Sequence, residues 1–591
     1  MRHEASVPEP HATIPLPMPQ QHELRPDGTS PTAILVAVAW PYANNNLHVG
    51  HLAGAYVPAD VFARYHRMRG NRVLMVSGSD SHGTPVTVRA EEEGTTPEAV
   101  FQRYHESFLR TFEGYGISFD LFTSTDTDNH REVAQDIFLR LLEREYLYEA
   151  EEELLYDAKV NRFLPDRYVE GTCPKCGYEG ARGDQCDNCG STLDAVDLIN
   201  PRSKLSDTTP ERRRTSHFFL KLSAFNDELL KWIETKEDWR PHVKNFTVGM
   251  LKEGLHDRAI TRDLTWGVPI PLEGYDSKRI YVWFEAVIGY LSAAKEWAAS
   301  DLNSSGDAET WRDWWESPDA GTYYFIGKDN VPFHTVIWPA ILMGYGDLNL
   351  PTDVPANQYL TMSGTKASKS RGGAVWAPDA LERYDPDPMR YYLTAAAPET
   401  SDSDFTWDEF VRRNNDELVA RWGNLVNRVL TITRRNFEER VPEPPSTLSD
   451  ESTALLARVD EAFASVGQSF EAVQLRRALN GAMEVATAAN QYLDARQPWV
   501  RVKEDRDHAA ETLFVALNVI SGLASLLNPI LPFTSQKVWA MLAHDGEVQA
   551  AGWQRTPVEA GTMLPAPEPI FKKLDDSVVE EELARLAPPT P

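Results

Sequence analysis

The sequence has little cysteine and no long apolar run. Its 591 residues contain four cysteines, all between Cys173 and Cys189. A large chain with no other cysteine is typical of an intracellular protein, and a single tight cluster argues against a disulfide framework. No apolar run approaches the roughly 18 residues that a membrane helix needs. We therefore expect a cytoplasmic protein with no membrane span.

Basic side chains are fewer than acidic ones. The chain carries 59 Lys and Arg residues against 88 Asp and Glu residues, a formal net charge of −29. This balance argues against a protein that coats nucleic acid nonspecifically, because such proteins bind through an excess of positive charge. It leaves open a polynucleotide substrate that binds along a local basic path.

The N-terminal stretch lacks the apolar core of a secretory signal. Residues 1–33 are rich in proline and polar side chains, a composition that favours disorder. We expect a disordered extension there. The remainder has the composition of a soluble globular protein, and its length indicates several domains.

The first chemical motif follows a short apolar run. Ile34 to Val38 are five consecutive apolar residues and predict a strand buried on both faces, as in a parallel sheet. A loop rich in Pro and Asn follows, and it ends in His48, Gly50 and His51 before a helical pattern begins. Strand, loop and helix start form a favoured place for a phosphate, because free N–H groups and the helix dipole attract an anion. The glycine permits close approach, and the imidazoles can bond to phosphate oxygens.

Alternating strands and helices continue after this loop. Residues 72–76 predict a second strand, and residues 97–115 and 128–146 predict helices. This order predicts a parallel, doubly wound sheet. Asp80 then lies just past a strand, at the sheet edge where such folds bind ligands. An Asx turn or a helix cap is the alternative role for this side chain.

An insertion from 151 to 264 interrupts the α/β pattern and holds all the cysteines. The spacing is Cys173-x2-Cys176, nine residues, then Cys186-x2-Cys189. Two such turns can present four thiolates to one tetrahedral ion, which suits Zn²⁺. Because four thiolates leave no open coordination position, we expect one structural zinc in a small knuckle. Disulfides or free thiols are the alternative.

The α/β pattern resumes after the insertion. Residues 279–284 and 322–326 predict strands, and each is followed by a turn and a helical stretch. Further on, Lys366 and Lys369 lie in a loop rich in Gly and Ser. Such a mobile cationic loop can close on a triphosphate and stabilise pyrophosphate as it leaves. A solvated basic loop is the alternative.

From about residue 403 the pattern is helical throughout. Apolar residues recur at helical spacing over 408–437, 452–469, 473–495 and 508–527. This predicts a helical bundle. The segment after 561 is punctuated by prolines and predicts a strap or a loose terminus.

Two of these motifs resemble the signatures of class I aminoacyl-tRNA synthetases. His48-Val49-Gly50-His51 resembles His-Ile-Gly-His, and Lys366-Ala367-Ser368-Lys369-Ser370 resembles Lys-Met-Ser-Lys-Ser. Across about 34–565 the chain also resembles the methionyl-tRNA synthetase family. The segments that carry this second resemblance are 39–44, 83–85, 163–167, 266–271, 281–283 and 288–290. Trp40, Glu285, Val287 and Asn330 depart from residues found in many or some members.

The resemblance implies a Rossmann-like α/β catalytic domain with a zinc-knuckle insertion, followed by an all-α anticodon-binding bundle. The implied parts are a disordered extension (1–33), the two catalytic halves (34–150 and 265–352), the connective insertion (151–264), a stem-contact region with the Lys-Ala-Ser-Lys-Ser loop (353–407), the helical anticodon-binding domain (408–565) and a C-terminal tail (566–591).

The resemblance also implies an activity and a set of site residues. The expected reaction activates L-methionine with ATP and Mg²⁺, then transfers it to the 3′-terminal adenosine of initiator and elongator tRNA(Met). The implied residues are His48, His51, Lys366 and Lys369 for catalysis; these four with Gly50, Ser368 and Ser370 for ATP; Tyr42, Asp80, Trp283, Tyr290, His334 and Trp338 for methionine; and Asn424, Arg428, Pro498 and Trp499 for the anticodon.

Three readings compete with this one. A class I synthetase for leucine, isoleucine or valine needs a larger editing insertion, and one for cysteine uses a metal in its active site. A catalytically silent tRNA-binding relative needs damaged signatures, whereas both histidines and both lysines are present. A zinc-ribbon nucleic-acid binder explains only the cysteines. No further C-terminal module is visible, so we expect a monomer.

Overall fold

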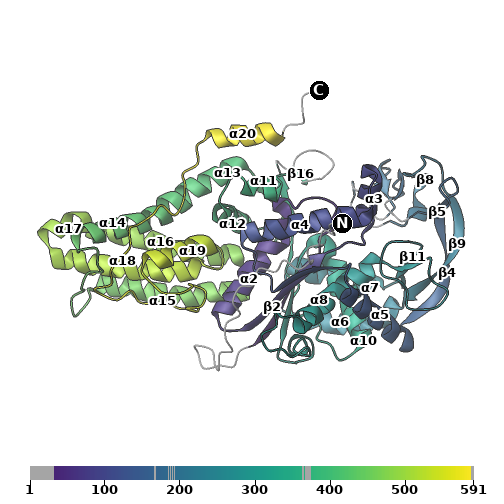
Figure 1. The fold of residues 1–591 in the computed structure, drawn as a ribbon, viewed down its shortest axis with the longest axis horizontal. Coiled ribbons are helices and arrows are strands. Elements are labelled where there is room, and N and C mark those ends of the chain that lie inside the picture. Colours follow the sequence, from purple (N-terminus) through teal and green to yellow (C-terminus); the bar gives the residue numbers. More distant parts are fainter. Residues whose placement is uncertain are drawn as a thin grey trace, which may run out of the picture.

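A computed structural model describes residues 32–164, 168–183, 186, 188–189, 191, 193–362, 365–366 and 374–586. The molecule is elongated, with a helical bundle at one end and a β-rich insertion at the other (Figure 1). Between them lies a five-stranded sheet in the order β14-β13-β1-β2-β3. Its strands are β1 (Ala33–Val38), β2 (Arg72–Ser79), β3 (Leu121–Ser124), β13 (Gly321–Gly327) and β14 (Ala356–Asn357).

All neighbouring strands of this sheet are parallel. The strand β1 is buried on both faces, as its apolar run predicts. Ile34, Val36 and Val38 belong to one hydrophobic cluster, whereas Leu35 and Ala37 belong to another on the opposite face. This alternation follows from the two-residue period of a strand, and it confirms the doubly wound parallel sheet.

Helices cover both faces of the sheet. One face carries α2 (Val57–Met68) and α4 (Pro97–Tyr115), and the other carries α5 (Asp128–Glu143), α8 (Val282–Ala299) and α10 (Trp338–Tyr345). Further helical segments complete the domain. They are α1 (Val49–His51), η1 (Leu52–Tyr56), α3 (Thr84–Glu93), α9 (Arg312–Trp315), η5 (Lys328–Asn330), η6 (Phe333–Ile337), α11 (Ala377–Leu381) and α12 (Pro386–Ala395).

The strand predicted at 279–284 is wrong for most of its length. Only β12 (Arg279–Ile280) is extended, and it pairs with β11 (Thr261–Arg262) in a separate two-stranded sheet. The helix α8 begins at Val282 instead. Because residues on nearly every side of α8 are buried, its sequence has no polar face that would reveal a helical period.

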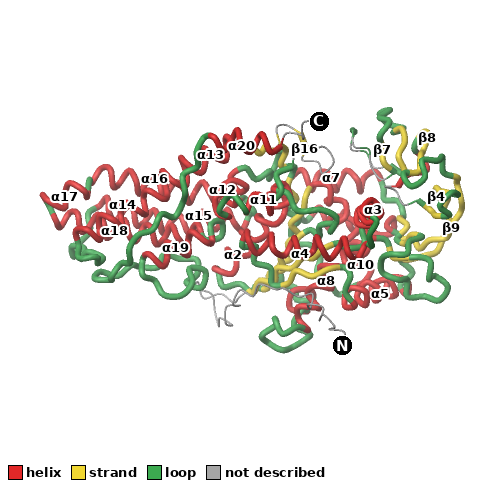
Figure 2. Tube along the Cα trace, turned by 45° about the horizontal axis from the view of Figure 1, so that its top comes forward, coloured by secondary structure: helices red, strands yellow, loops and turns green. Residues whose placement is uncertain are grey.

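The insertion is built on a long antiparallel pair, β4 (Leu147–Asp157) with β9 (Glu211–Leu220). Figure 2 shows these strands at the end of the molecule away from the bundle. A three-stranded knuckle and two helices complete it. The remaining elements are β5 (Arg162–Phe163), β6 (Val169–Thr172), β7 (Ala181–Arg182), η3 (Ala195–Asp197), β8 (Ile199–Ser203), η4 (Leu222–Phe225), α6 (Asn226–Glu234), α7 (Pro241–Glu253) and β10 (Arg258–Ala259).

The C-terminal part is the predicted helical bundle. A small sheet of β15 (Leu360–Met362), β16 (Thr365–Lys366) and β17 (Ser403–Phe405) precedes it. The bundle helices are α13 (Trp407–Arg412), η7 (Arg413–Gly423), α14 (Asn424–Asn436), α15 (Asp450–Glu471), α16 (Leu475–Arg496), α17 (Pro498–Glu504), α18 (Arg506–Leu527) and α19 (Pro532–Met541). The last described helix, α20 (Ser577–Leu586), lies outside the bundle against α13 (Figure 1).

One helix of the described chain, α18, is long and apolar enough to cross a membrane, which differs from the expectation that no run comes close. Its mean hydropathy is 1.7, but 94% of that stretch is buried inside the bundle. The helices α15, α16, α17 and α19 pack around it. It is thus the central helix of the bundle in this structure, and its apolar faces are covered by protein.

Candidate active site

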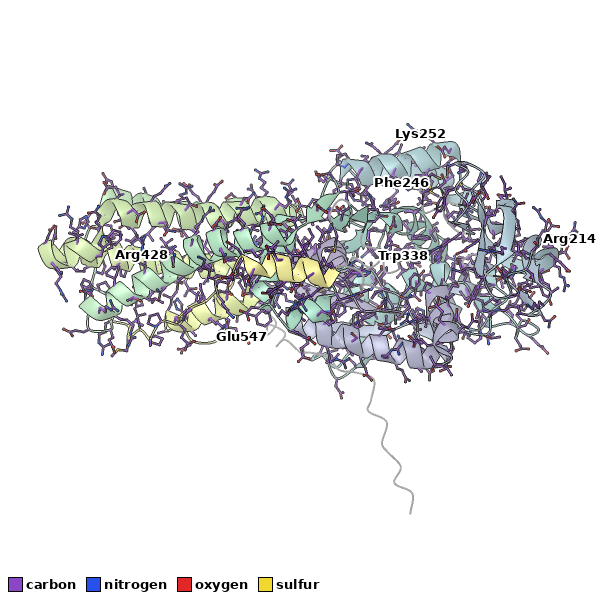
Figure 3. The ribbon with its side chains drawn as sticks, turned by 90° about the horizontal axis from the view of Figure 1, so that it is seen from above. Arg214, Phe246, Lys252, Trp338, Arg428 and Glu547 are labelled. Atoms are coloured by element: carbon purple, nitrogen blue, oxygen red, sulfur yellow. The ribbon has the colours of Figure 1, made fainter. Side chains whose placement is uncertain are left out.

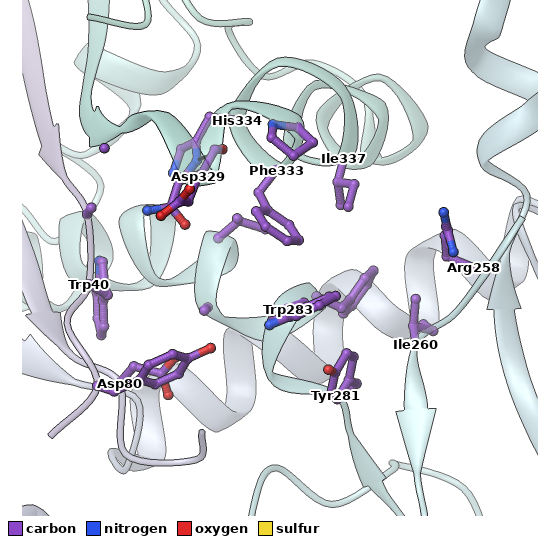
Figure 4. Close-up of a pocket in the computed structure, with 18 of the residues that line it drawn as sticks. Trp40, Asp80, Arg258, Ile260, Tyr281, Trp283, Asp329, Phe333, His334 and Ile337 are labelled. Carbon is purple, nitrogen blue, oxygen red and sulfur yellow. Dashed lines mark hydrogen bonds between the residues drawn. The ribbon is translucent and has the colours of Figure 1, made fainter. Parts of the chain in front are cut away.

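A cavity of about 910 Å³ opens at the carboxyl ends of the central strands, between the sheet and the insertion. Trp40 and Asp80 line it from the strand ends, Trp283 from α8, His334 from η6 and Arg258 from the insertion (Figure 4). This is the edge where doubly wound sheets bind ligands. The volume lies near the upper end of the usual range for small-molecule pockets.

Asp80 follows β2 directly and is held from both sides. Its backbone N–H donates to the Pro41 carbonyl at 2.9 Å, and its own carbonyl accepts from Ala43 at 3.0 Å. The carboxylate oxygen Oδ1 accepts from the backbone N–H groups of His82 and Gly83 at 3.2 and 3.1 Å. The Asx turn offered as the alternative role is therefore present, and the same side chain lines the cavity.

The charge around Asp80 is unusual. Its side chain is buried, and burial together with the nearby Glu285 carboxylate raises the pKa of Asp80 to about 8. His82 lies beside the pair, with Nδ1 2.6 Å from Oε1 of Glu285. Burial alone would lower the pKa of His82, but Glu285 and Asp126 outweigh it and raise that pKa to about 10. Two buried carboxyl groups thus share one imidazolium, and a second cation is favoured at Asp80.

An aromatic pair forms the far wall of the cavity. The Oη of Tyr290 lies 2.7 Å from Nε2 of His334, whose Nδ1 lies 2.9 Å from the carbonyl oxygen of Asn330. Burial lowers the pKa of His334 to about 4, so the ring is neutral near pH 7. A neutral ring donates from Nδ1 to the carbonyl and accepts from the tyrosine hydroxyl at Nε2. The Tyr290–His334 pair thus carries no charge and suits an uncharged side chain.

Trp40 was noted in the sequence only as a departure, yet it lines the same cavity. A Cβ placed on Gly78 would lie 2.5 Å from its ring, and one on Gly289 would lie 2.7 Å from it. The indole therefore fits only because glycine occupies both neighbouring positions. The departure at this position was the sequence signal that could have identified it.

The other predicted methionine residues divide into two groups. Tyr42 and Trp283 line the cavity, and the Tyr42 ring lies against Gly83, where a Cβ would be 2.2 Å away. Trp338 does not line it. Its ring is fully buried, and its Nε1–H donates to the Tyr324 hydroxyl at 2.9 Å. As the first residue of α10, Trp338 packs into the core beneath the cavity.

The two histidines of the first signature lie against each other at the cavity edge, with ring centroids 3.8 Å apart. The backbone N–H of Gly50 donates to Nδ1 of His48, and the backbone N–H of His48 donates to Nδ1 of His51, both at 3.1 Å. A neutral imidazole that accepts at Nδ1 carries its proton on Nε2. Each ring therefore has an N–H donor suited to a phosphate oxygen.

Only Lys366 of the second signature lies within the described residues. Lys366 ends β16, which pairs with β15, while Ser368, Lys369 and Ser370 lie outside the described residues. The chain that follows this loop pairs directly with the histidine loop. Val49 donates to the Val375 carbonyl at 3.0 Å, and Ala377 donates to the Leu47 carbonyl at 2.8 Å.

The four cysteines converge, and none forms a disulfide. Their sulfur atoms all lie within 4.8 Å of one another. The Cys173–Cys189 and Cys176–Cys186 sulfur separations are 4.0 and 3.6 Å. Tetrahedral zinc with Zn–S bonds of about 2.3 Å places its sulfur ligands about 3.8 Å apart, so the cluster fits this ion.

The predicted anticodon residues lie in the bundle. The Arg428 guanidinium is 5.1 Å from the ring centroid of Trp499 and 3.3 Å from Oδ1 of Asp494. Trp499 is 39% exposed, whereas Pro498 is buried at the start of α17. Asn424 lies one helical turn before Arg428 and is exposed. Figure 3 shows Arg428 far along the molecule from Arg214 of the insertion.

Comparisons with known proteins agree with this geometry. The family model described as "tRNA synthetases class I (M)" matches residues 34–430. A second model, "Anticodon binding domain of methionyl tRNA ligase", matches residues 441–589.

Named relatives and solved structures extend the match to almost the whole chain. A methionine–tRNA ligase of Thermomicrobium roseum is 53% identical, covering 94% of this chain and 99% of the relative. One from Dehalococcoides mccartyi is 55% identical with the same coverage. Mycobacterium tuberculosis methionyl-tRNA synthetase in complex with methionyl-adenylate is 28% identical with a TM-score of 0.76, covering 92% of this chain and 99% of that chain. The chain belongs to the methionyl-tRNA synthetase family of class I aminoacyl-tRNA synthetases.

Proposed function

We propose that this cavity binds L-methionine and ATP side by side, forms methionyl-adenylate and pyrophosphate, and passes methionine to the 3′-terminal adenosine of tRNA(Met). One observation carries the proposal. The buried Asp80 carboxylate and the neutral Tyr290–His334 pair line the same cavity as the paired His48 and His51 rings. An amino acid and a nucleoside triphosphate can thus bind in the same cavity.

The amino-acid half of the site matches methionine. The substrate ammonium pairs with Asp80, whose surroundings favour an added cation. The thioether is unbranched and polarisable, and it packs well against aromatic rings. Tyr42, Trp283 and Tyr290 supply such rings around the cavity. The Tyr290 hydroxyl and neutral His334 add polarity without charge, which disfavours charged side chains.

The nucleotide half of the site is built for phosphate. The Nε2–H groups of His48 and His51 donate to phosphate oxygens, and Gly50 permits close approach of the backbone. Lys366 and Lys369, with Ser368 and Ser370, bind the leaving pyrophosphate. Mg²⁺ bound to the triphosphate neutralises part of its charge.

The first step needs no protein nucleophile. A carboxylate oxygen of methionine attacks the α-phosphorus of ATP, and pyrophosphate leaves with the electron pair of the broken bond. The ribose hydroxyl of the tRNA then attacks the acyl carbon, and AMP leaves. Positioning and electrostatic stabilisation of phosphoryl charge supply the catalysis. Replacing Lys369 with Ala is expected to reduce methionine-dependent ATP–pyrophosphate exchange by orders of magnitude, whereas methionine should still bind.

The rest of the chain supports this centre. One Zn²⁺ on Cys173, Cys176, Cys186 and Cys189 stabilises the knuckle, whose own hydrophobic cluster is small. In the bundle, Arg428 and Trp499 form a donor and a stacking surface for single-stranded anticodon bases, flanked by Asn424 and Pro498. We propose that a cytoplasmic monomer charges both initiator and elongator tRNA(Met).

The deciding experiment is amino-acid-dependent ATP–pyrophosphate exchange over a panel of all standard amino acids. We expect methionine to support exchange at least 100-fold better than leucine, isoleucine, valine or cysteine. Purified initiator and elongator tRNA(Met) are then charged with labelled methionine. Exchange driven better by another amino acid, or no exchange at all, would overturn the proposal.

A further inference from the structure

The helix that follows the histidine loop contains a break in its hydrogen bonding. The segment η1 (Leu52–Tyr56) is a π-helical turn, and the Val57 N–H bonds to the Leu52 carbonyl, five residues back. The carbonyl of Ala53 thereby loses the donor it would have in an α-helix. Pro58 follows in the first turn of α2. Proline has no N–H, so the Gly54 carbonyl loses its donor as well.

One buried side chain supplies a donor to both carbonyls. The Nδ2 group of Asn357 lies 2.9 Å from the Gly54 oxygen and 3.4 Å from the Ala53 oxygen. Asn357 ends β14, next to β13 in the central sheet, and is 1% exposed. The Asn357 amide therefore bonds the π-turn behind His51 to the sheet.

Arg240 fixes the orientation of that amide. It enters from the start of α7 and donates through Nη1 to Oδ1 of Asn357 at 2.6 Å and to the Ala356 carbonyl at 2.9 Å. Because Oδ1 accepts from a guanidinium, Nδ2 must face the π-turn. A charge-assisted bond of this kind is stronger than one between neutral groups.

The same guanidinium reaches the helical bundle. Its Nη2 donates to the Val473 carbonyl at 3.2 Å, in the turn between α15 and α16. Val473 is buried and has a left-handed backbone with φ of 50°. That conformation is strained for a β-branched residue, and strain of this kind persists only where surrounding contacts enforce it. Arg240 and Asn357 thus connect a strained turn of the bundle to the π-turn that follows His51.

We propose that Asn357 and Arg240 are positioning residues for the histidine loop, and that Arg240 fixes that loop relative to the bundle through Val473. The proposal rests on the proposed function, because it assigns the loop to the phosphates of ATP. A displacement of about 1 Å in a positioned group can cost about 100-fold in rate. The pair therefore acts on ATP use, while the methionine half of the site keeps its own contacts.

The first test is a double-mutant cycle between Asn357 and Pro58. Asn357→Ala is expected to lower kcat/KM for ATP in ATP–pyrophosphate exchange by 10- to 100-fold, with the methionine Kd from tryptophan fluorescence changing less than twofold. Pro58→Ala restores an N–H that can bond to Gly54. In that background, adding Asn357→Ala is expected to cost less than threefold. If Asn357→Ala lowers kcat/KM for ATP as much in the Pro58→Ala background as in the wild type, the proposal is overturned.

The second test separates positioning from packing at Arg240. Arg240→Lys keeps the charge but cannot bond to Asn357 and Val473 at once, so we expect a 5- to 20-fold loss in kcat/KM for ATP. His242→Ala is the matched control. Its Nε2 lies 3.0 Å from the Ala356 carbonyl without bonding to Asn357, and we expect less than a twofold change.

The outcomes separate the two proposals. A wild-type protein without methionine-dependent exchange would overturn the proposed function and the positioning role with it. An active wild type whose Asn357→Ala and Arg240→Lys variants retain full ATP kcat/KM would overturn the positioning role alone. Equal losses of methionine affinity, ATP use and Tm in both variants would also overturn it, since they indicate general packing.

Discussion

Among single residues, Asp80 has the clearest chemical signature. Burial and the Glu285 carboxylate raise its pKa to about 8. A raised carboxyl pKa means that the ionised form is lost as pH falls through about 8. In the proposed function, that ionised form pairs with the substrate ammonium. The free protein must therefore release a proton from Asp80 when it binds methionine at lower pH.

The first prediction concerns this proton. We expect the methionine association constant to fall up to tenfold for each pH unit below about 8, because one unit of pKa corresponds to a tenfold change. Equilibrium binding by tryptophan fluorescence between pH 6 and 8.5 measures it. Glu285→Gln removes one cause of the shift and should move the transition to lower pH. A wild-type affinity that stays flat from pH 6 to 8 would contradict the assignment.

The second prediction concerns the space around Trp40. Gly289→Ala places a Cβ where the structure leaves 2.7 Å to the indole, and overpacking of this kind costs about 1–3 kcal/mol. We expect the methionine KM in pyrophosphate exchange to rise at least fivefold. Trp40→Leu in the same chain should recover most of that loss. Failure of the second substitution to relieve the first would show that Gly289 acts through other contacts.

At the scale of elements, the zinc knuckle is the part most dependent on a ligand. Cys186 is buried, and its sulfur lies 3.6 Å from that of Cys176. We expect Cys186→Ser to reduce bound zinc from one equivalent per chain to less than 0.2. Limited proteolysis should then cleave within 168–203, because the knuckle has few other apolar contacts. Atomic absorption and mass mapping measure the two effects.

The neighbouring Ser191→Ala is the control for this experiment. The Ser191 hydroxyl lies 3.4 Å from the Cys189 sulfur, but Ser191 is not one of the four proposed zinc ligands. It should retain zinc and resist cleavage. Full zinc content in Cys186→Ser would contradict a four-thiolate site.

Much of the architecture could be predicted from local sequence. The helix at 97–115 is found with those bounds, because Thr96 caps its start and Gly116 adopts the left-handed conformation at its end. The strand at 279–284 could not be predicted correctly, because α8 is buried on nearly all sides and shows no helical period. Period-based reasoning works only where one side of an element faces solvent.

The site was less predictable than the fold. Sequence and resemblance pointed to Asp80, Tyr290, His334 and the two histidines, all of which line the cavity. They also pointed to Trp338, which lies beneath it. Roles that depend on atomic geometry had no sequence signal. The protonation of each signature histidine follows from which ring nitrogen accepts a hydrogen bond. Asn357 bonds to backbone carbonyl groups, and because every residue has such a group, the sequence does not reveal the contact.

At the scale of the whole molecule, the proposed anticodon-binding residues lie in the bundle and do not line the cavity. Trp499 is 39% exposed beside Arg428, far from the cavity. We expect Trp499→Ala to raise the KM for tRNA at least tenfold, since stacking of a base on an aromatic ring is worth about 1–3 kcal/mol. Pyrophosphate exchange should change less than twofold. Aminoacylation kinetics with both tRNAs measure the effect, and equal loss of exchange would favour a structural anchor instead.

The catalytic domain also contains a buried ion pair whose arginine bonds to the bundle. Asp60 of α2 accepts from Arg390 of α12 at 2.6 Å and from Arg64 at 2.8 Å, and Arg390 also donates to the Pro529 and Ile530 carbonyls of the bundle. Burial raises the pKa of Asp60, but the two arginines outweigh it and lower that pKa to about 2. The stability from this pair is present above about pH 4 and is lost as pH falls toward 2.

The fifth prediction follows from this pair. Asp60→Asn leaves buried guanidinium groups without their anion, and breaking such a pair costs about 3–5 kcal/mol. Urea unfolding at pH 7 should show that loss. The difference from wild type should shrink as pH falls below about 4. An equal deficit at pH 7 and pH 2.5 would mean that Asp60 acts by shape alone.

One feature of the core bears on how this protein evolves and tolerates damage. A single hydrophobic cluster runs from β1 through α2 into α15, α16 and α18, so these helices of the bundle and the catalytic domain share one core. Removing or unfolding the bundle would expose the side of α2 that packs against α15, where Tyr65 contacts Phe470. Unfolding of these parts should occur as one transition, and mutations of the buried bundle residues in this cluster should impair catalysis by destabilising the whole chain.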